Sequence, residues 1–203
     1  MMNEETLSLV QLGIGTVGRE LIKKVMDWNC SKGPGKNYSY AGFADKSGYV
    51  TERPGFSTDK LEELLERKGR GEKLIEICPD KVEGIQSFES SISRFDEGVL
   101  IDVTDAGKFV DMYREALDSG WSVVLANKIP LTEIDPEEFC EFRNRRVRYE
   151  TTVGAGLPVI STLNHLKRQG EDFKEIAAVL SGSLGFILSR VEKGFELNRA
   201  VLE

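Results

Sequence analysis

Three glycines near the start of the chain have a spacing that suits phosphate binding. Gly13, Gly15 and Gly18 form the pattern G-x-G-x-x-G, between the apolar run 7–12 and a helix expected over 16–28. The first glycine of this pattern allows a tight turn, the second lets the backbone approach a pyrophosphate, and the third lets helix and strand pack closely. The N-terminus of the helix adds partial positive charge. We therefore predict a dinucleotide-binding turn, with the residues Gly13, Ile14, Gly15, Thr16, Val17 and Gly18. The alternative is a strand–helix turn that binds nothing.

An acidic residue ends the second expected strand, 38–45 (YSYAGFAD). Asp45 stands where proteins with this glycine pattern place an acid that hydrogen-bonds the adenosine ribose. It lies further from the glycines than the usual ~20 residues, and the loop-like segment 31–37 accounts for the extra length. Lys46 and Ser47 follow the acid and could bind a 2′-phosphate, so these residues leave NAD and NADP both open.

Two further strand ends carry polar side chains. Thr104 and Asp105 follow the apolar stretch VLIDV, and Asn127 and Lys128 follow WSVVLA. Ligands of open α/β sheets bind beyond the carboxyl ends of the strands, which is where these residues are expected. A lysine that is partly desolvated there has a lowered pKa and suits proton transfer or binding of a carbonyl oxygen. The alternative is that its stem covers apolar surface while the ammonium group stays in water.

The segment 153–159 (VGAGLPV) combines two glycines with a proline. Backbone carbonyls in such a turn can face a cation, and the amides that open the next helix can face an anion. Spacing alone favours a hinge or a simple helix start. The only histidine, His165, falls inside an expected helix, and we interpret it as a surface or core-packing residue rather than a catalytic one. A Ser-His-Asp or Cys-His system and a zinc site are therefore not supported.

The elements that must position these residues alternate along the chain. Strands are expected over 7–12, 38–45, 99–105, 121–126 and 147–151, and helices over 16–28, 58–68, 107–119 and 136–145. Asp135 and Pro136 suit the N-cap and the first position of the last of these helices. The alternation favours an α/β fold with a doubly wound, parallel, Rossmann-type sheet and helices on both faces.

The character of the chain changes after the glycine-rich turn. We predict a dinucleotide-binding domain over 1–152 and the beginning of a second, α+β domain over 153–203. In the second domain we expect helices over 158–168 and 184–193 and a strand over 174–180.

Composition limits the classes of function. The 203 residues carry a formal net charge of −7 with scattered basic residues, which argues against nucleic-acid binding. No apolar run is long enough to span a membrane, and the N-terminus has no signal-peptide pattern. The three cysteines (Cys30, Cys78 and Cys140) have no metal-like spacing, and we expect reduced thiols in a cytoplasmic protein.

Taken in order, five segments resemble homoserine dehydrogenase. They are LGIGTVG, VLIDVTD, VVLANKIPLT, YETTVGAGLPVI and LSGSLGFIL, and the resemblance runs from about residue 7 to the last residue. The sequence ANK followed by E-x-x-V-G-A-G-L-P is specific to that family, whereas the glycine pattern is not. The resemblance implies NAD(P)-dependent interconversion of aspartate 4-semialdehyde and L-homoserine, a step towards threonine, methionine and isoleucine.

The resemblance also implies roles for individual residues. Thr104 is placed on the nicotinamide side of the cofactor, Asn127 and Lys128 also contact the cofactor, and Lys128 is a candidate proton donor to the aldehyde oxygen. A monovalent-cation site, commonly sodium, involves Glu150, Val153, Ala155 and Leu157, mostly through backbone oxygens. The implied substrate-binding residues are Glu150, Gly182 and Ser183, where the serine keeps the hydroxyl of the family's Gly-Thr pair.

The chain also departs from the family pattern. The family continues with a G-Y-x-E-x-D-P segment, an aspartate, a second lysine and the strands that form a homodimer interface, and this chain stops before them. We therefore expect an N-terminal portion with an intact cofactor half, an incomplete domain for substrate binding and dimerisation, and little or no turnover on its own.

Two other functions fit parts of the sequence. A non-catalytic dinucleotide-binding regulatory or sensor protein would bind cofactor without any effect of Lys128→Ala on a dehydrogenase assay. A semialdehyde dehydrogenase that works through a thioester needs a reactive cysteine beside a base. Cys140 falls in a charged helix and His165 is the only histidine, which argues against the thioester route.

Overall fold

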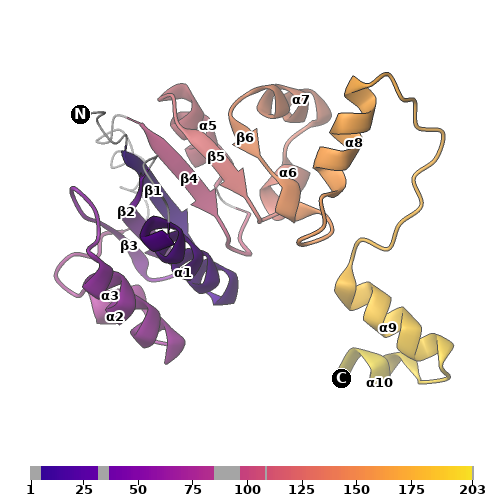
Figure 1. Ribbon diagram of the computed structural model, residues 1–203. Helices are drawn as coiled ribbons and strands as arrows, with labels where there is room; N and C mark the ends of the chain where they lie inside the picture. Colours follow the sequence, from indigo (N-terminus) through magenta and orange to yellow (C-terminus); the bar gives the residue numbers. More distant parts are fainter. Residues whose placement is uncertain (1–5, 32–36, 85–96, 108, 203) are drawn as a thin grey trace. The chain divides into compact units, whose positions relative to one another are not determined.

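The computed structural model describes residues 6–31, 37–84, 97–107 and 109–202 (Figure 1). The chain forms two compact units, Met1–Arg148 and Tyr149–Glu203, which are described separately below.

The first unit is built on a six-stranded sheet with the order β3-β2-β1-β4-β5-β6. Its parallel strands are β1 (Thr6–Leu12), β2 (Asn37–Asp45), β4 (Gly98–Asp102), β5 (Ser122–Leu125) and β6 (Val147–Arg148). The remaining strand, β3 (Gly48–Thr51), pairs antiparallel with β2 at the edge. The prediction of a doubly wound α/β sheet is confirmed. Because β2 and β4 lie on opposite sides of β1, the switch point of the sheet is at the carboxyl ends of β1 and β4, where ligands of such sheets bind.

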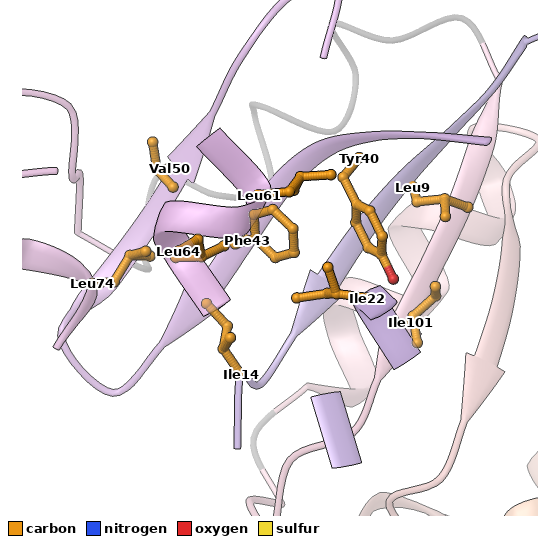
Figure 2. Packing of buried hydrophobic residues seen from close by; sticks show 10 residues of the cluster. All are labelled: Leu9, Ile14, Ile22, Tyr40, Phe43, Val50, Leu61, Leu64, Leu74 and Ile101. Carbon is orange, nitrogen blue, oxygen red and sulfur yellow. The ribbon is translucent and has the colours of Figure 1, made fainter. Parts of the chain in front are cut away.

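One face of this sheet is covered by the helices α1 (Thr16–Ser31), α2 (Thr58–Gly69) and α3 (Leu74–Ile77). Apolar side chains from these helices and from alternate strand positions meet in one cluster, as Figure 2 shows. The cluster consists of Leu9, Ile14, Ile22, Tyr40, Phe43, Val50, Leu61, Leu64, Leu74 and Ile101. Each large apolar side chain buried here stabilises the fold by about 1.5–3 kcal/mol. The cluster therefore holds the start of α1 firmly against the ends of β1 and β2.

The opposite face is covered by α5 (Val110–Asp118). Its Met112, Tyr113, Ala116 and Leu117 are buried, and the Ala116 carbonyl accepts from the amide of the fully buried Trp121 at 2.9 Å. A side chain at Gly98 would come within 2.8 Å of the Trp121 ring, so this glycine is needed for the close packing of β4 against the indole. Two more helices, α6 (Ile129–Glu133) and α7 (Pro136–Asn144), follow β5. Asp135 caps α7 as predicted, because its carboxylate accepts from the amides of Glu137 and Glu138 at 2.9 Å each.

Some predicted boundaries differ from the structure. β3 was not predicted, because only Lys46 and Ser47 separate its four residues from β2 and so short a run shows no clear alternation. The strand predicted over 147–151 ends at Arg148, where pairing with β5 stops, and Glu150–Thr152 forms the 3-10 helix η2.

The second unit contains α8 (Val159–Arg168), α9 (Gly182–Glu192) and α10 (Leu197–Leu202) in addition to η2. The strand predicted over 174–180 is wrong, since these residues form no strand. A strand needs a neighbour for its backbone hydrogen bonds, and the described part of this unit offers none. Its large apolar side chains are largely exposed, including Ile176, Val179 and Leu188 at 61–77%. Within the described residues, no helix has the length and apolar character needed to cross a membrane.

Candidate functional site

The glycine turn between β1 and α1 uses each glycine for a different reason. Gly13 has a φ of +95°, a backbone conformation that favours glycine, and its amide donates to the carbonyl of Ala44 at 2.9 Å. A Cβ at Gly18 would lie 2.3 Å from the carbonyl oxygen of Gly13, so any larger residue would push the helix away from the turn. A Cβ at Gly15 would meet nothing within 4 Å. The backbone of Gly15 therefore faces open space.

The first turn of α1 is open to solvent beside this space. Thr16 and Val17 are exposed, and the first turn holds no acidic side chain that would neutralise the positive end of the helix. Free amide groups at a helix N-terminus, with the helix dipole behind them, form a ready site for a phosphate group. The arrangement fits the pyrophosphate of a dinucleotide: a close backbone approach at Gly15 and an uncovered helix end.

Gln11 supports this turn and was not selected from the sequence. Its side chain is fully buried, and its Nε2 donates to the carbonyls of Gly13 at 2.8 Å and Gly18 at 3.2 Å. Its Oε1 accepts from the Tyr40 hydroxyl at 3.0 Å. The one signal in the sequence was a polar residue between the apolar Val10 and Leu12, next to the glycine pattern.

The Asp45 carboxylate at the end of β2 is engaged by the protein itself. One oxygen accepts from the amide of Ser47 at 2.7 Å and from its hydroxyl at 2.6 Å. The other accepts from the Lys68 ammonium at 2.7 Å and from the amide of Leu74 at 2.8 Å. Burial raises the pKa of the Asp45 carboxyl, but the hydrogen bonds from Lys68, Ser47 and Leu74 outweigh it and hold the pKa below its ordinary value. With four donors on two oxygens, a ribose hydroxyl would have to displace one of them.

Lys46, which follows β2, reaches towards Asp105, which follows β4. Its side chain is 93% exposed, and its ammonium lies 3.9 Å from the carboxylate of Asp105, which is also exposed. An exposed pair of this kind contributes little to stability. The ammonium of Lys46 is therefore available to an anionic ligand at the carboxyl edge of the sheet.

A buried polar network lies at the carboxyl ends of β4 and β5. Asp102 is fully buried, and its carboxylate accepts from the Thr104 amide at 2.8 Å, from Asn127 Nδ2 at 3.0 Å and from the Tyr113 hydroxyl. Burial, and then the charge of Asp102, raise the pKa of Tyr113, so its hydroxyl stays protonated and donates. Neither Asp102 nor Tyr113 was selected from the sequence. Asp102 appears there only as one polar residue in a buried strand.

Asn127 joins this network to the residues proposed for cofactor binding. Its Nδ2 also lies 3.1 Å from the Thr104 hydroxyl and 2.7 Å from the carbonyl of Ala106, and its Oδ1 accepts from the amide of Ile129 at 3.1 Å. These bonds fix the backbone on both sides of Lys128, which caps α6. The Lys128 side chain is exposed. The described first unit therefore does not give this lysine the partial desolvation that we expected from the sequence.

The structure brings the glycine turn and Thr104 together. A Cβ at Gly13 would lie 3.1 Å from Thr104 Cγ2 and 3.0 Å from the carbonyl oxygen of Val103. Asn127 reaches the same place through its bond to the Thr104 hydroxyl. The turn, Thr104 and Asn127 thus share the carboxyl edge of the sheet at its switch point.

The remaining predicted residues lie in the second unit. Glu150 caps α8, because its carboxylate accepts from the amides of Ile160 at 2.9 Å and Ser161 at 2.8 Å. The turn that follows bends sharply at Gly154 and Ala155, both with positive φ, and Val153 and Leu157 flank it. Both Glu150 oxygens thus serve the helix, and the turn provides no separate support for a sodium ion. Among the residues that the structure describes, no group of three or more His, Cys, Asp or Glu side chains could hold a metal ion.

Gly182 and Ser183 begin α9 and are exposed. The preceding Ser181 caps the helix by accepting from the amide of Leu184 at 3.2 Å. The hydroxyl of Ser183 is thus on the first turn of a helix whose cap is provided by another residue.

No protein-family model matches the chain. Among curated proteins, the homoserine dehydrogenase of Pyrococcus horikoshii is 31% identical over 193 residues, which cover 94% of this chain and 58% of that protein. The bifunctional aspartokinase/homoserine dehydrogenase of Buchnera aphidicola is 27% identical over 99% of this chain and 24% of its own length. The chain therefore spans from a quarter to under two thirds of these relatives.

Several solved structures that are similar to this chain are homoserine dehydrogenases as well. A hyperthermophilic archaeal homoserine dehydrogenase in complex with NADPH superposes with a TM-score of 0.79 at 29% identity, covering 97% of this chain and 59% of that one. The homoserine dehydrogenase of Thermoplasma acidophilum, at 22% identity, shares the fold with a TM-score of 0.74. Sequence and fold together show that this chain is similar to a part of the homoserine dehydrogenases.

Proposed function

We propose that this chain is the cofactor-binding part of a homoserine dehydrogenase and binds NADPH or NADH at the turn between β1 and α1. The observation that supports this most directly is the open backbone at Gly15 beside the uncovered N-terminus of α1. The NADPH complex of a related homoserine dehydrogenase, with 29% identity to this chain, supports the same assignment.

In this proposal the chain's own groups divide the work. Amide groups of the turn and the first helical turn bind the pyrophosphate, and Thr104 and Asn127 hold the nicotinamide side at the ends of β4 and β5. The bound dinucleotide supplies or accepts the hydride. Lys128 donates a proton to the carbonyl oxygen of aspartate 4-semialdehyde during reduction and takes it back during oxidation of homoserine. The rigid backbone around Lys128 supports this role, because Asn127 fixes the residues next to it.

We further propose that the site accepts the 2′-phosphate of NADPH. The charge of Asp45 is compensated by Lys68 at 2.7 Å, so the carboxylate opposes an incoming phosphate less than a free acid would. Lys46 follows Asp45 in the chain, and its exposed ammonium, 3.9 Å from the Asp105 carboxylate, is the proposed partner for the phosphate. NADH remains the alternative cofactor, and it would use the same turn.

Substrate binding and assembly belong to the second unit in this proposal. Gly182 and Ser183 contact the substrate, and the exposed apolar side chains of α9 and α10 support a role in assembly, for which the family suggests a homodimer. The chain spans 58% of the Pyrococcus horikoshii protein, and we propose homoserine oxidation for the enzyme of which this chain matches a part.

Two matched glycine substitutions test cofactor binding. Gly15→Ala adds a methyl group where nothing lies within 4 Å, as Gly69→Ala does at the end of α2. Both variants should fold like the parent, but only Gly15→Ala fills the space in front of the turn. In fluorescence titrations with NADPH and NADH we expect Gly15→Ala to raise the Kd about tenfold or more, and Gly69→Ala to leave it unchanged. If neither cofactor binds the parent chain, or if the two variants behave alike, the proposal is wrong.

A further inference from the structure

Gln11 is an unusual side chain for its position. It lies in the central strand β1, on the face covered by α1, and none of its surface is exposed. A buried amide must satisfy its hydrogen-bonding groups or cost stability. Gln11 does so through contacts that all converge on the glycine turn and on β2, at distances of 2.8–3.2 Å.

The orientation of the amide follows from its partners. The carbonyl oxygens of Gly13 and Gly18 can only accept, so the NH₂ group of Gln11 must face them. The Tyr40 hydroxyl donates to the remaining Oε1 and prevents the amide from turning over. Tyr40 is itself 1% exposed and packs against Phe43 with ring centroids 4.9 Å apart, so it is a rigid support.

The bond to Gly13 determines where the next amide points. The Gly13–Ile14 peptide is trans, so its N–H is directed opposite to its carbonyl. With the carbonyl held inward by Gln11, the Ile14 N–H is directed away from Gln11. Gly18 contributes to the same arrangement, since the absence of a side chain lets the helix approach the Gly13 carbonyl.

We infer that Gln11, held by Tyr40, is a positioning residue that sets the Gly13–Ile14 peptide for binding the pyrophosphate of the dinucleotide. The inference rests on the proposed function of this turn. Gln11 contacts the carbonyl side of the turn and does not touch the ligand. Its loss therefore weakens binding of ligands that carry the pyrophosphate and spares the adenosine end.

The test compares two ligands on the parent chain and on two variants. NADPH requires the whole site, whereas adenosine 2′-phosphate lacks the pyrophosphate and requires only the adenosine end. Gln11→Met keeps the length of the side chain and removes its hydrogen bonds. Tyr49→Phe is the control, because the buried Tyr49 also donates through its hydroxyl, to Glu83 at 2.8 Å, but at the β3 edge of the sheet. If the chain binds NADH rather than NADPH, NADH and adenosine replace the two ligands.

We expect Gln11→Met to raise the Kd for NADPH about tenfold and to leave that for adenosine 2′-phosphate within about twofold, while Tyr49→Phe changes neither. An unchanged NADPH affinity in a folded Gln11→Met protein, or a parallel loss for both ligands, would overturn the inference. Should Gln11→Met fail to fold, Tyr40→Phe replaces it: a selective loss of affinity for NADPH supports the inference, and an unchanged affinity or a parallel loss for both ligands refutes it. Failure of the parent chain to bind either dinucleotide would instead refute the proposed function.

Discussion

Replacing Tyr113 with phenylalanine removes one hydroxyl from the buried network at the end of β4 and preserves the packing of the ring. That hydroxyl donates to Asp102, a carboxylate with none of its surface exposed. Losing a hydrogen bond to a charged group costs about 1.5–3 kcal/mol. For a domain of this size each kcal/mol corresponds to roughly 2–4 °C of Tm. We therefore expect Tyr113→Phe to lower the Tm by about 3–12 °C.

Tyr40→Phe provides a matched comparison within the same sheet. Its hydroxyl is equally buried, but it donates to the neutral amide of Gln11 at 3.0 Å. A bond between neutral groups contributes about 0.5–1.5 kcal/mol, so the fall in Tm should be about half as large or less. Thermal unfolding followed by far-UV circular dichroism at neutral pH measures both variants. A Tyr40→Phe protein that loses as much stability as Tyr113→Phe, or an unaffected Tyr113→Phe, would refute the claim that Asp102 is a buried charge held by its donors.

Three further outcomes are expected. Because the pKa of Asp45 is lowered on folding, its contribution to stability is fully present above its unfolded pKa of about 3.9 and is lost as pH falls through the lower folded value. Asp45→Asn should therefore flatten the acid side of a curve of unfolding free energy against pH, and an unchanged curve would contradict this. Gly18→Ala should destabilise the chain clearly more than Gly15→Ala in urea unfolding, because its Cβ would lie 2.3 Å from the Gly13 carbonyl; equal midpoints would show that the contact relaxes freely. Under conditions in which the parent chain oxidises homoserine, Lys128→Ala should abolish that oxidation, and a variant that keeps the parent's rate would remove Lys128 from the proposed proton transfer.

Local sequence was enough to predict the parallel strands of the first unit and several of its helices. The helix after the glycines begins at Thr16 as expected, and β2 ends at Asp45 as expected. Glycine spacing, a run of apolar residues and the Asp135–Pro136 cap are local signals, and each depends on residues within one or two turns of the chain. The edge strand β3 and the absence of a strand over 174–180 depend on pairing with distant segments, which no local pattern contains.

The hydrogen-bond partners of the candidate site residues could not be predicted either, because they also come from distant segments of the chain. Asp45 was predicted from its place at a strand end, but its four donors come from Ser47, Lys68 and Leu74, up to 29 residues away. Asp102 and Tyr113 meet only because α5 packs against the sheet so that the Tyr113 hydroxyl reaches the end of β4. A sequence pattern predicts which residues reach a strand end, whereas it contains no information on which of their hydrogen-bonding groups the fold has already used.

By itself the sequence determined the order of the five parallel strands along the chain, the place of the turn at the end of β1, and several of the residues at the carboxyl edge of the sheet, since these follow from local periodicity and glycine spacing. Only the tertiary structure decided which polar groups at that edge are available. Gln11, Asp45 and Asp102 have their capacity filled by protein partners, while the backbone at Gly15 and the ammonium groups of Lys46 and Lys128 face solvent. The reason is physical: a buried polar atom must find its partner within hydrogen-bonding distance, and the packing of α1, α2 and α5 against the sheet sets which atoms come that close.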